Sequence, residues 1–330
     1  MKQSKKTSTC WVGFDLGGSK MMATVFDHAF NIVAFERKKT RGEIGMEAGL
    51  ARMAKTIQSA LDQAGQKQEN LSGIGVGCPG PLDLDKGVII DTPNIGWREV
   101  PVKAYMEKTF SCPAVIANDV DAGTYGEYRF GAARKARCVL GVFPGTGIGG
   151  ACIYEGRIFR GRTGSCMELG HFPVCPQGAM AGPGRYGTLE SMTSRLALAS
   201  QAAMTAYRGQ APALMRMAGT NVADIKSGIL ARAIEEGDTI IEELVRRTAA
   251  QLGMTLAGVI NLLAPDVVVL GGGLVEAMPA LYLEEVKQAL TSHAMPAYAK
   301  EARVVTAELG DNACVMGAAA LVADAERAAA

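Results

Sequence analysis

Residues 11–26, WVGFDLGGSKMMATVF, have the pattern of two apolar strands joined by a tight glycine turn. Residues 139–154, VLGVFPGTGIGGACIY, repeat the pattern of strand, glycine-rich hairpin and strand, with little shared identity. Two such units in one chain predict two related α/β domains, whose glycine loops face one cleft.

The rest of the chain alternates between strand-like and helix-like runs. In the first half we predict strands near 30–36, over 73–78 and near 113–117, and helices over 47–64 and near 101–109. In the second half we predict strands over 138–143, 150–154, 266–273 and near 302–306, and helices over 189–206, 228–236, 238–263, near 280–291 and near 311–325. We place a small domain at 1–118, completed by a C-terminal helix at about 311–330, and a large domain at 119–310.

Composition excludes several classes of function. The chain has 330 residues, 48% of them hydrophobic, and is long enough for two domains. Its formal net charge of +1 gives no support to a nucleic-acid or membrane-surface role. No signal-peptide core or membrane-spanning run is present, which favours the cytoplasm. The eight cysteines are scattered without a C-x-x-C pair, as expected of reduced structural cysteines.

Three glycine clusters follow predicted strands. DLGGSK (15–20) offers unobstructed backbone N–H groups, the Ser19 hydroxyl and the Lys20 amine to phosphate oxygens, and Asp15 could hold a hydrated Mg²⁺. GTGIGG (145–150) matches G-x-G-x-x-G, but a strand-like run follows it where the dinucleotide-binding fold needs a helix. With GGG at 271–273, the three clusters predict a nucleotide site.

Asp119 is the main candidate for a general base. It follows Asn118 at a predicted strand–helix junction, where a carboxylate could accept the proton of a substrate hydroxyl during phosphoryl transfer. The alternative is that Asp119 is only the N-cap of the helix, and Asp121 is a rival base. Glu168 and Glu190 adjoin glycine-rich segments that could fold over a polar ligand.

The segment GHFPVCPQGAMAGPGRYGTLE, residues 170–190, has the composition of a metal-binding loop, a substrate-binding loop or a long turn. A structural zinc needs about four ligands at close spacing, and this loop offers only His171 and Cys175. We therefore expect no zinc here.

Taken in order, the motifs of the chain resemble those of the ROK family (repressors, open reading frames, sugar kinases), within the actin/hexokinase-like (ribonuclease H-like) fold. They are DLGGSK, GCPGPLD, NIGW (94–97), NDVDAGTYGE (118–127), GTGIGG, ELGH (168–171), GTLE (187–190) and DNACVMGAAAL (311–321). The resemblance implies a two-domain, ATP- and Mg²⁺-dependent hexose kinase of the glucokinase type that acts in glycolysis.

The resemblance also assigns residues, each by its place in a motif. Asp119 matches the family's catalytic base for the sugar 6-hydroxyl. The sugar-binding positions are Asn94, Asn118, Glu168, His171 and Glu190. The phosphate loops contain Gly17, Gly18, Ser19, Gly145, Thr146 and Gly147, with Gly271 and Gly272 at the adenosine site.

Three departures from the family pattern stand out. Ser19 replaces the usual Thr, and Asp121 replaces the Asn of the NDANA-type motif. Many members bind zinc through the His of ExGH and three cysteines, but the cysteine positions here are Ala181, Pro183 and Thr188. Proline, glycine packing and Tyr186 would have to order the loop instead.

Other interpretations stay open. Family repressors carry an N-terminal DNA-binding segment, for which the start of the first strand near residue 11 leaves no room, so we expect a kinase rather than a sugar sensor. Glucose is the first choice of substrate, with mannose, N-acetylglucosamine, N-acetylmannosamine, allose and fructose as alternatives, and polyphosphate is an alternative donor. Family precedent predicts a homodimer.

Overall fold

The computed structural model describes residues 9–162, 164 and 166–329, which divide into two compact units. The first unit comprises the described residues of Met1–Lys135, Ile158–Cys166 and Asp311–Ala330, and the second comprises Ala136–Arg157 and Met167–Gly310. In the described part of the chain, no helix combines the length and the hydropathy needed to cross a membrane.

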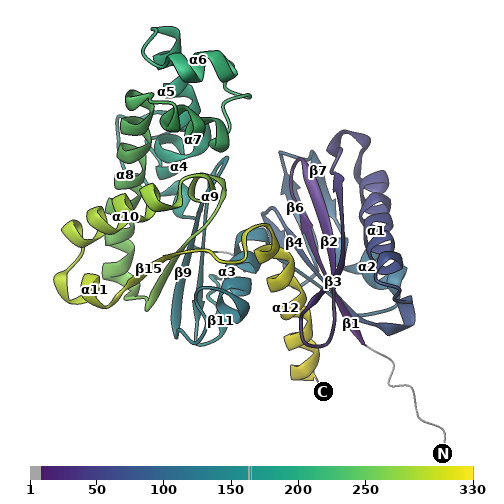
Figure 1. Ribbon diagram of the computed structural model, residues 1–330. Helices are drawn as coiled ribbons and strands as arrows, with labels where there is room; N and C mark the ends of the chain where they lie inside the picture. The colour runs from purple at the N-terminus through teal and green to yellow at the C-terminus, as the bar shows by residue number, and fades with distance from the viewer. Residues whose placement is uncertain (1–8, 163, 165, 330) are drawn as a thin grey trace, which may run out of the picture. The chain divides into compact units, whose positions relative to one another are not determined.

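A five-stranded sheet organises the first unit, in the order β3 (Ile32–Lys39), β2 (Lys20–Phe26), β1 (Cys10–Leu16), β4 (Leu71–Cys78) and β8 (Ala114–Asn118). The first three strands are antiparallel, and β4 and β8 run parallel to β1. Helices α1 (Met46–Gln63) and α2 (Val102–Phe110) cover one face, while α3 (Asp119–Phe130) and α12 (Ala313–Ala329) cover the other (Figure 1).

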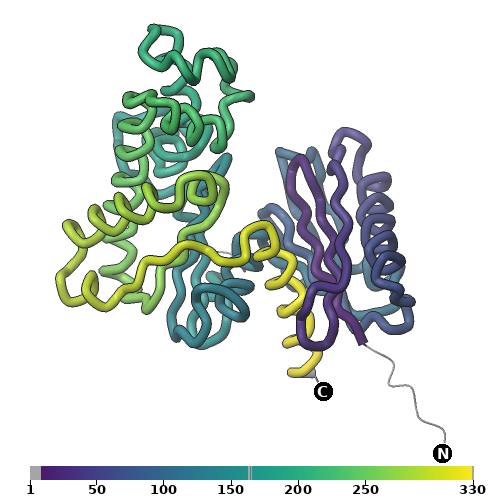
Figure 2. The backbone as a smooth tube through the Cα atoms, viewed as in Figure 1, coloured from purple at the N-terminus to yellow at the C-terminus, as the bar shows by residue number. Residues whose placement is uncertain are grey.

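Helix α12 approaches the strands very closely. A Cβ atom at Gly13 would lie 1.9 Å from the Val315 carbonyl oxygen, and one at Gly75 would lie 1.8 Å from that of Ala318. Only glycine allows this contact between helix and sheet. Segments from the two ends of the sequence therefore lie side by side (Figure 2).

The predicted domain boundary at 118/119 differs from the division seen in the structure. The first unit continues to Lys135, because α3 packs against α12. A Cβ at Gly126 would lie 2.3 Å from the Ala313 oxygen, and one at Gly317 would lie 1.8 Å from the Ala122 oxygen.

A small sheet that the sequence did not predict lies beside the main sheet of the first unit. It contains β5 (Leu82–Asp83), β6 (Val88–Thr92) and β7 (Trp97–Val100). Trp97 is 1% exposed, and its ring fills the space that a side chain at Gly49 of α1 would need. This packing fixes the turn between β6 and β7, which contains Asn94.

The second unit has a sheet in the order β11 (Arg157–Ile158), β10 (Ile148–Tyr154), β9 (Cys138–Pro144), β14 (Val267–Leu270) and β15 (Arg303–Thr306). Helices α8 (Thr239–Leu263) and α10 (Pro279–His293) pack together and share its apolar core. The other elements are η3 (Leu169–His171), β12 (Met180–Gly182), β13 (Arg185–Tyr186), α4 (Leu189–Thr193), α5 (Arg195–Tyr207), α6 (Pro212–Ala218), α7 (Ser227–Glu235), α9 (Gly273–Ala277) and α11 (Pro296–Glu301).

The prediction of a single helix over 189–206 is wrong, because the structure has two helices there, α4 and α5. Ser194 has an extended backbone (φ −70°, ψ 164°), which ends α4 and starts α5. Its hydroxyl accepts a hydrogen bond from the Ala197 amide, as an N-cap residue does. Arg195 is therefore the first residue of a helix rather than an internal one.

Candidate active site

The DLGGSK segment forms the hairpin turn between β1 and β2. The Gly17 amide donates to the Lys20 carbonyl (3.0 Å), and the Thr40 hydroxyl donates to the Gly17 carbonyl (2.6 Å), which fixes the turn. Gly18 and Ser19 are exposed at its tip. A Cβ at Gly18 would lie 3.6 Å from the Asn94 Cβ, so one predicted sugar-binding residue lies next to a predicted phosphate turn.

Asp15 lies just before this turn, at the end of β1 and in register with Gly77 of β4. Burial and the negative charge of Asp119 raise the pKa of Asp15 from 3.8 to about 6, with a smaller contribution from Asp311. A hydrogen bond from the Cys314 thiol acts in the opposite direction. The single Asp15 carboxylate is compatible with Mg²⁺, which takes one or two protein carboxylates beside its waters and substrate phosphates.

A small cavity of about 110 Å³ opens beside Asp15. It is lined by Lys20, Arg37 and Asp311 together with Met21 and Met22. Arg37 Nη2 donates to Asp311 at 2.9 Å, so the cavity is lined by both acidic and basic groups. Lys20 and Asp15 therefore line the same cavity.

Asn118 and Asp119 occupy the junction of β8 and α3. The Asn118 side-chain oxygen accepts the amides of Val120 (2.9 Å) and Asp121 (3.2 Å), which makes Asn118 the N-cap. Asp119 is the first residue of the helix, and its Oδ1 accepts the Val120 amide at 3.0 Å. The alternative that Asp119 serves as the N-cap is therefore excluded.

Asp121, the rival base, has a different environment. It is 8% exposed, and Arg160 Nη1 lies 3.4 Å from its Oδ2. The same Arg160 nitrogen donates to the Gly164 carbonyl at 2.9 Å. Asp121 is therefore paired with Arg160, which lies in the segment Ile158–Cys166 of the first unit. Asp119 is half-buried at the start of α3.

The second glycine turn joins β9 and β10, with β10 following where a dinucleotide-binding fold would have a helix. The Gly145 amide donates to the Gly147 carbonyl (2.8 Å), and Thr146 is exposed at the tip. Glu190 Oε2 accepts the Ile148 amide at 2.8 Å, and it fills the space beside Gly147 that a Cβ would need. A predicted sugar-binding acid thus contacts a predicted phosphate turn within one unit.

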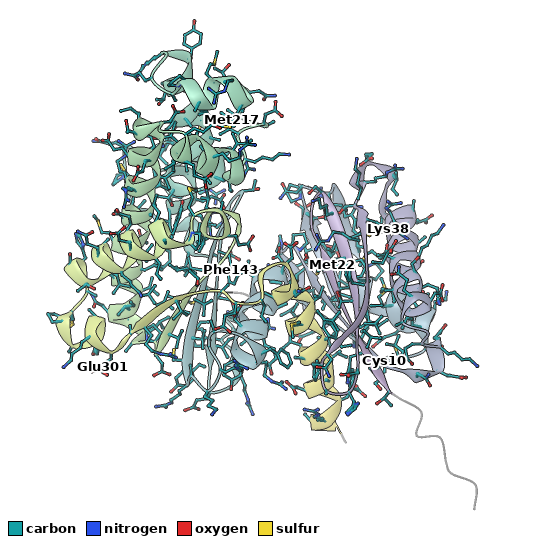
Figure 3. All side chains as sticks on the ribbon, viewed as in Figure 1. Cys10, Met22, Lys38, Phe143, Met217 and Glu301 are labelled. Atoms are coloured by element: carbon teal, nitrogen blue, oxygen red, sulfur yellow. The ribbon has the colours of Figure 1, made fainter. Side chains whose placement is uncertain are left out.

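Gly271 and Gly272 pack against the end of β9. A Cβ at Gly271 would lie 2.6 Å from the Phe143 ring, and one at Gly272 would lie 2.9 Å from the Pro144 oxygen. Figure 3 labels Phe143 in the second unit. Gly272 has a φ of 79°, which favours glycine. The third glycine cluster therefore lies next to the start of the second turn.

A cavity of about 590 Å³ brings together His171, Thr146, Thr188 and Glu190 in the second unit. Glu168 directly precedes η3, which ends at His171, and its carbonyl accepts the His171 amide at 3.0 Å. Met167, just before Glu168, has a φ of 61°, an uncommon conformation for a residue with a side chain.

Backbone contacts order the loop between His171 and Glu190. The Val174 and Cys175 amides both donate to the Gly187 carbonyl, and a Cβ at Gly187 would lie 1.5 Å from the Cys175 oxygen. Ala181 lies in the β12–β13 hairpin, with Pro183 at its turn. Among the described residues, no cluster of three or more His, Cys, Asp or Glu could hold a metal ion.

Thr188, at the third of the expected cysteine positions, has a structural role that sequence reasoning missed. It is the N-cap of α4, and its hydroxyl accepts the Ser191 amide at 3.2 Å. Its backbone forms an antiparallel bridge with Pro173. Thr188 therefore anchors the short helix that contains Glu190.

Each of the two α/β units begins with a strand, a glycine turn and a second strand, and its polar residues lie at strand ends. This arrangement is that of the actin/hexokinase-like class of two-domain proteins. The chain belongs to the ROK family, whose profile matches residues 11–325.

Similar proteins include enzymes and regulators. A glucokinase of Halalkalibacterium halodurans is 31% identical, with 96% of each chain covered. The crystal structure of a ROK family glucokinase from Streptomyces griseus, in complex with glucose and AMPPNP, matches with a TM-score of 0.82 and 29% identity, over 96% of this chain and 99% of that one. A xylose repressor of Caldicellulosiruptor bescii is 25% identical, over 94% of this chain and 77% of its own length.

Proposed function

We propose that this protein phosphorylates the 6-hydroxyl of a hexose with ATP, and that glucose is its preferred substrate. The observation that carries the proposal is the arrangement at the start of α3. Asn118 is the N-cap of the helix and Arg160 pairs with Asp121, whereas Asp119 is the half-buried acid at the first position of the helix. The glucokinase relatives support this assignment.

In the proposed reaction Asp119 accepts the proton of the sugar 6-hydroxyl. The hydroxyl oxygen forms a bond to the γ-phosphorus, and the bond to the oxygen of the leaving ADP breaks. Asn94, Asn118, Glu168, His171 and Glu190 orient the sugar, because hydroxyls left unpaired in a site are costly.

The glycine turns would bind the donor. The Gly17 and Gly145 amides close the two turns by internal hydrogen bonds. The backbone N–H groups and hydroxyls of Gly18 and Ser19 in the first turn, and of Thr146 and Gly147 in the second, would face the phosphates. Gly271 and Gly272 would lie at the adenosine. Asp15 would hold a hydrated Mg²⁺ and Lys20 would contact phosphate; the metal neutralises charge on the phosphate oxygens when bound.

The test is a panel of hexoses and N-acetylhexosamines with MgATP or polyphosphate as donor. We expect ADP release with MgATP, with the highest kcat/KM for glucose. A higher kcat/KM for another sugar would correct the substrate, and turnover with polyphosphate alone would correct the donor. If no sugar is phosphorylated with either donor, the kinase proposal is wrong.

A sugar-sensing role without catalysis is the second candidate, because the chain is also similar to a xylose repressor. A sensor would bind hexose without releasing ADP. Calorimetry with the sugars of the same panel separates this outcome from inactive protein.

We also propose that the protein forms a homodimer. Light scattering of the purified protein tests this.

A further inference from the structure

Arg195, the first residue of α5, contacts the second glycine turn at two points. Its backbone amide donates to the Gly145 carbonyl at 2.9 Å. Its guanidinium Nη2 donates to the Thr146 hydroxyl at 3.0 Å. The side chain of Arg195 therefore lies at the tip of the turn that we assign to the phosphoryl donor.

No ion pair among the described residues balances the charge of this guanidinium. Its other hydrogen bond, from Nη1, goes to the neutral Ile225 carbonyl at 3.4 Å. Among the described residues, none of the ion pairs includes Arg195. Glu190 also contacts the turn, but its carboxylate accepts the Ile148 amide. A half-buried cation at this place thus has N–H groups beyond those used in its two bonds.

The surroundings increase the positive potential. The first turn of α5 contains no acidic residue, and an arginine at the first position of a helix adds to the positive end of the helix dipole. This placement is unfavourable for an arginine unless an anion offsets it. The adjacent turn offers backbone N–H groups to the same anion.

We propose that Arg195 binds the phosphate chain of the phosphoryl donor. The proposal rests on the proposed function, which assigns the turn at 145–147 to the donor. A guanidinium matches phosphate oxygens in two-point geometry, and its bonds to them are strengthened by charge. Arg195 contributes to donor binding through phosphate oxygens, a chemistry that a nucleoside triphosphate and an inorganic polyphosphate share.

The test compares Arg195→Met with Arg195→Lys, and with Arg208→Met as a matched control on an exposed arginine of the same segment. Calorimetry measures the Kd of Mg·AMPPNP, of Mg-tripolyphosphate, of adenosine and of glucose. For Arg195→Met we expect Kd to rise about 10- to 100-fold for both phosphate ligands, the range for losing hydrogen bonds to a charged group. The Kd values for adenosine and glucose should stay at their wild-type values. For Arg195→Lys, the Kd for each phosphate ligand should lie between those of wild type and Arg195→Met.

Two results would overturn the inference. One is an unchanged Kd for both phosphate ligands in Arg195→Met. The other is an equal loss for adenosine or glucose, which would show a general disturbance of the unit. Weaker binding of tripolyphosphate only, or of AMPPNP only, supports the inference and identifies the donor.

The readout also separates this inference from the proposed function. If wild-type protein binds Mg·AMPPNP through Arg195 but phosphorylates no sugar, the inference stands and the kinase proposal fails. If sugars are phosphorylated but donor binding does not depend on Arg195, the kinase proposal stands and the inference fails.

Discussion

The Glu190 carboxylate accepts the Ile148 amide at 2.8 Å, and this bond joins the loop assigned to the sugar to the turn assigned to the donor. Gly147 leaves room for the carboxylate, since a Cβ there would lie 2.3 Å from Glu190 Oε2. One acid therefore serves two parts of the second unit.

This double contact predicts that Glu190→Ala raises the KM of both substrates. The sugar loses a carboxylate, and the Ile148 amide at the donor turn loses its partner, each costing on the order of 1.5–3 kcal/mol. Glu190→Gln keeps an oxygen for the amide, so its KM for MgATP should stay near wild type. Steady-state kinetics with each substrate varied decides this, and equal effects of the two variants on MgATP would contradict it.

Asp119→Asn should lower kcat by about 10²- to 10⁴-fold, because the proton of the sugar hydroxyl loses its acceptor. Sugar binding, measured by calorimetry, should largely survive. Asp121→Asn is the matched control on the same helical turn, and we expect a much smaller loss of kcat. A larger loss in Asp121→Asn than in Asp119→Asn would move the role of base to Asp121.

Asp15 predicts a pH dependence of stability. Its pKa of about 6 in the folded protein lies above the ordinary value of 3.8, so the folded state binds a proton between pH 4 and 6 that the unfolded state does not. Asp15 therefore lowers the free energy of unfolding above pH 6, and this cost disappears as the pH falls towards 4.

We expect Asp15→Asn, without Mg²⁺ or nucleotide, to raise Tm at pH 7.5 and to leave it nearly unchanged at pH 4. The effect should be on the order of 1 kcal/mol for this half-buried group, or about 2–4 °C. Scanning calorimetry across this pH range measures it. A stabilisation that grows towards pH 4 would have the wrong sign.

Thr188→Val should destabilise the start of α4, because the Ser191 amide loses the hydroxyl that caps it. The expected cost is about 1 kcal/mol. The KM for sugar should rise with it, since Glu190 lies in the first turn of that helix. Thr188→Ser keeps the cap and should behave as wild type, and chemical denaturation together with sugar kinetics compares the two.

The sequence predicted the class of fold from local patterns. The strands of both hairpins, the long helices and the glycine turns have short-range signatures that the structure confirms. The small sheet with Trp97 was missed, because its strands have two to five residues and depend on packing against α1.

Arg195 was missed for a related reason. An apolar periodicity over 189–206 hides the break at Ser194, so that Arg195 looked like one more residue of a helix surface. Its contact with Thr146 joins positions 49 apart in the chain, which no local pattern reveals. The signal present in the sequence was a serine followed by an arginine within a run of helix-forming residues.

The close contact of α12 with Gly13 and Gly75 has a consequence for biosynthesis. The first strands leave the ribosome early, but the helix that covers one face of their sheet is made only after the whole second unit. During translation that face lacks α12, one of its two covering helices, so the first unit is completed last although it is begun first. A nascent chain arrested before residue 313 should therefore expose this apolar face to chaperones.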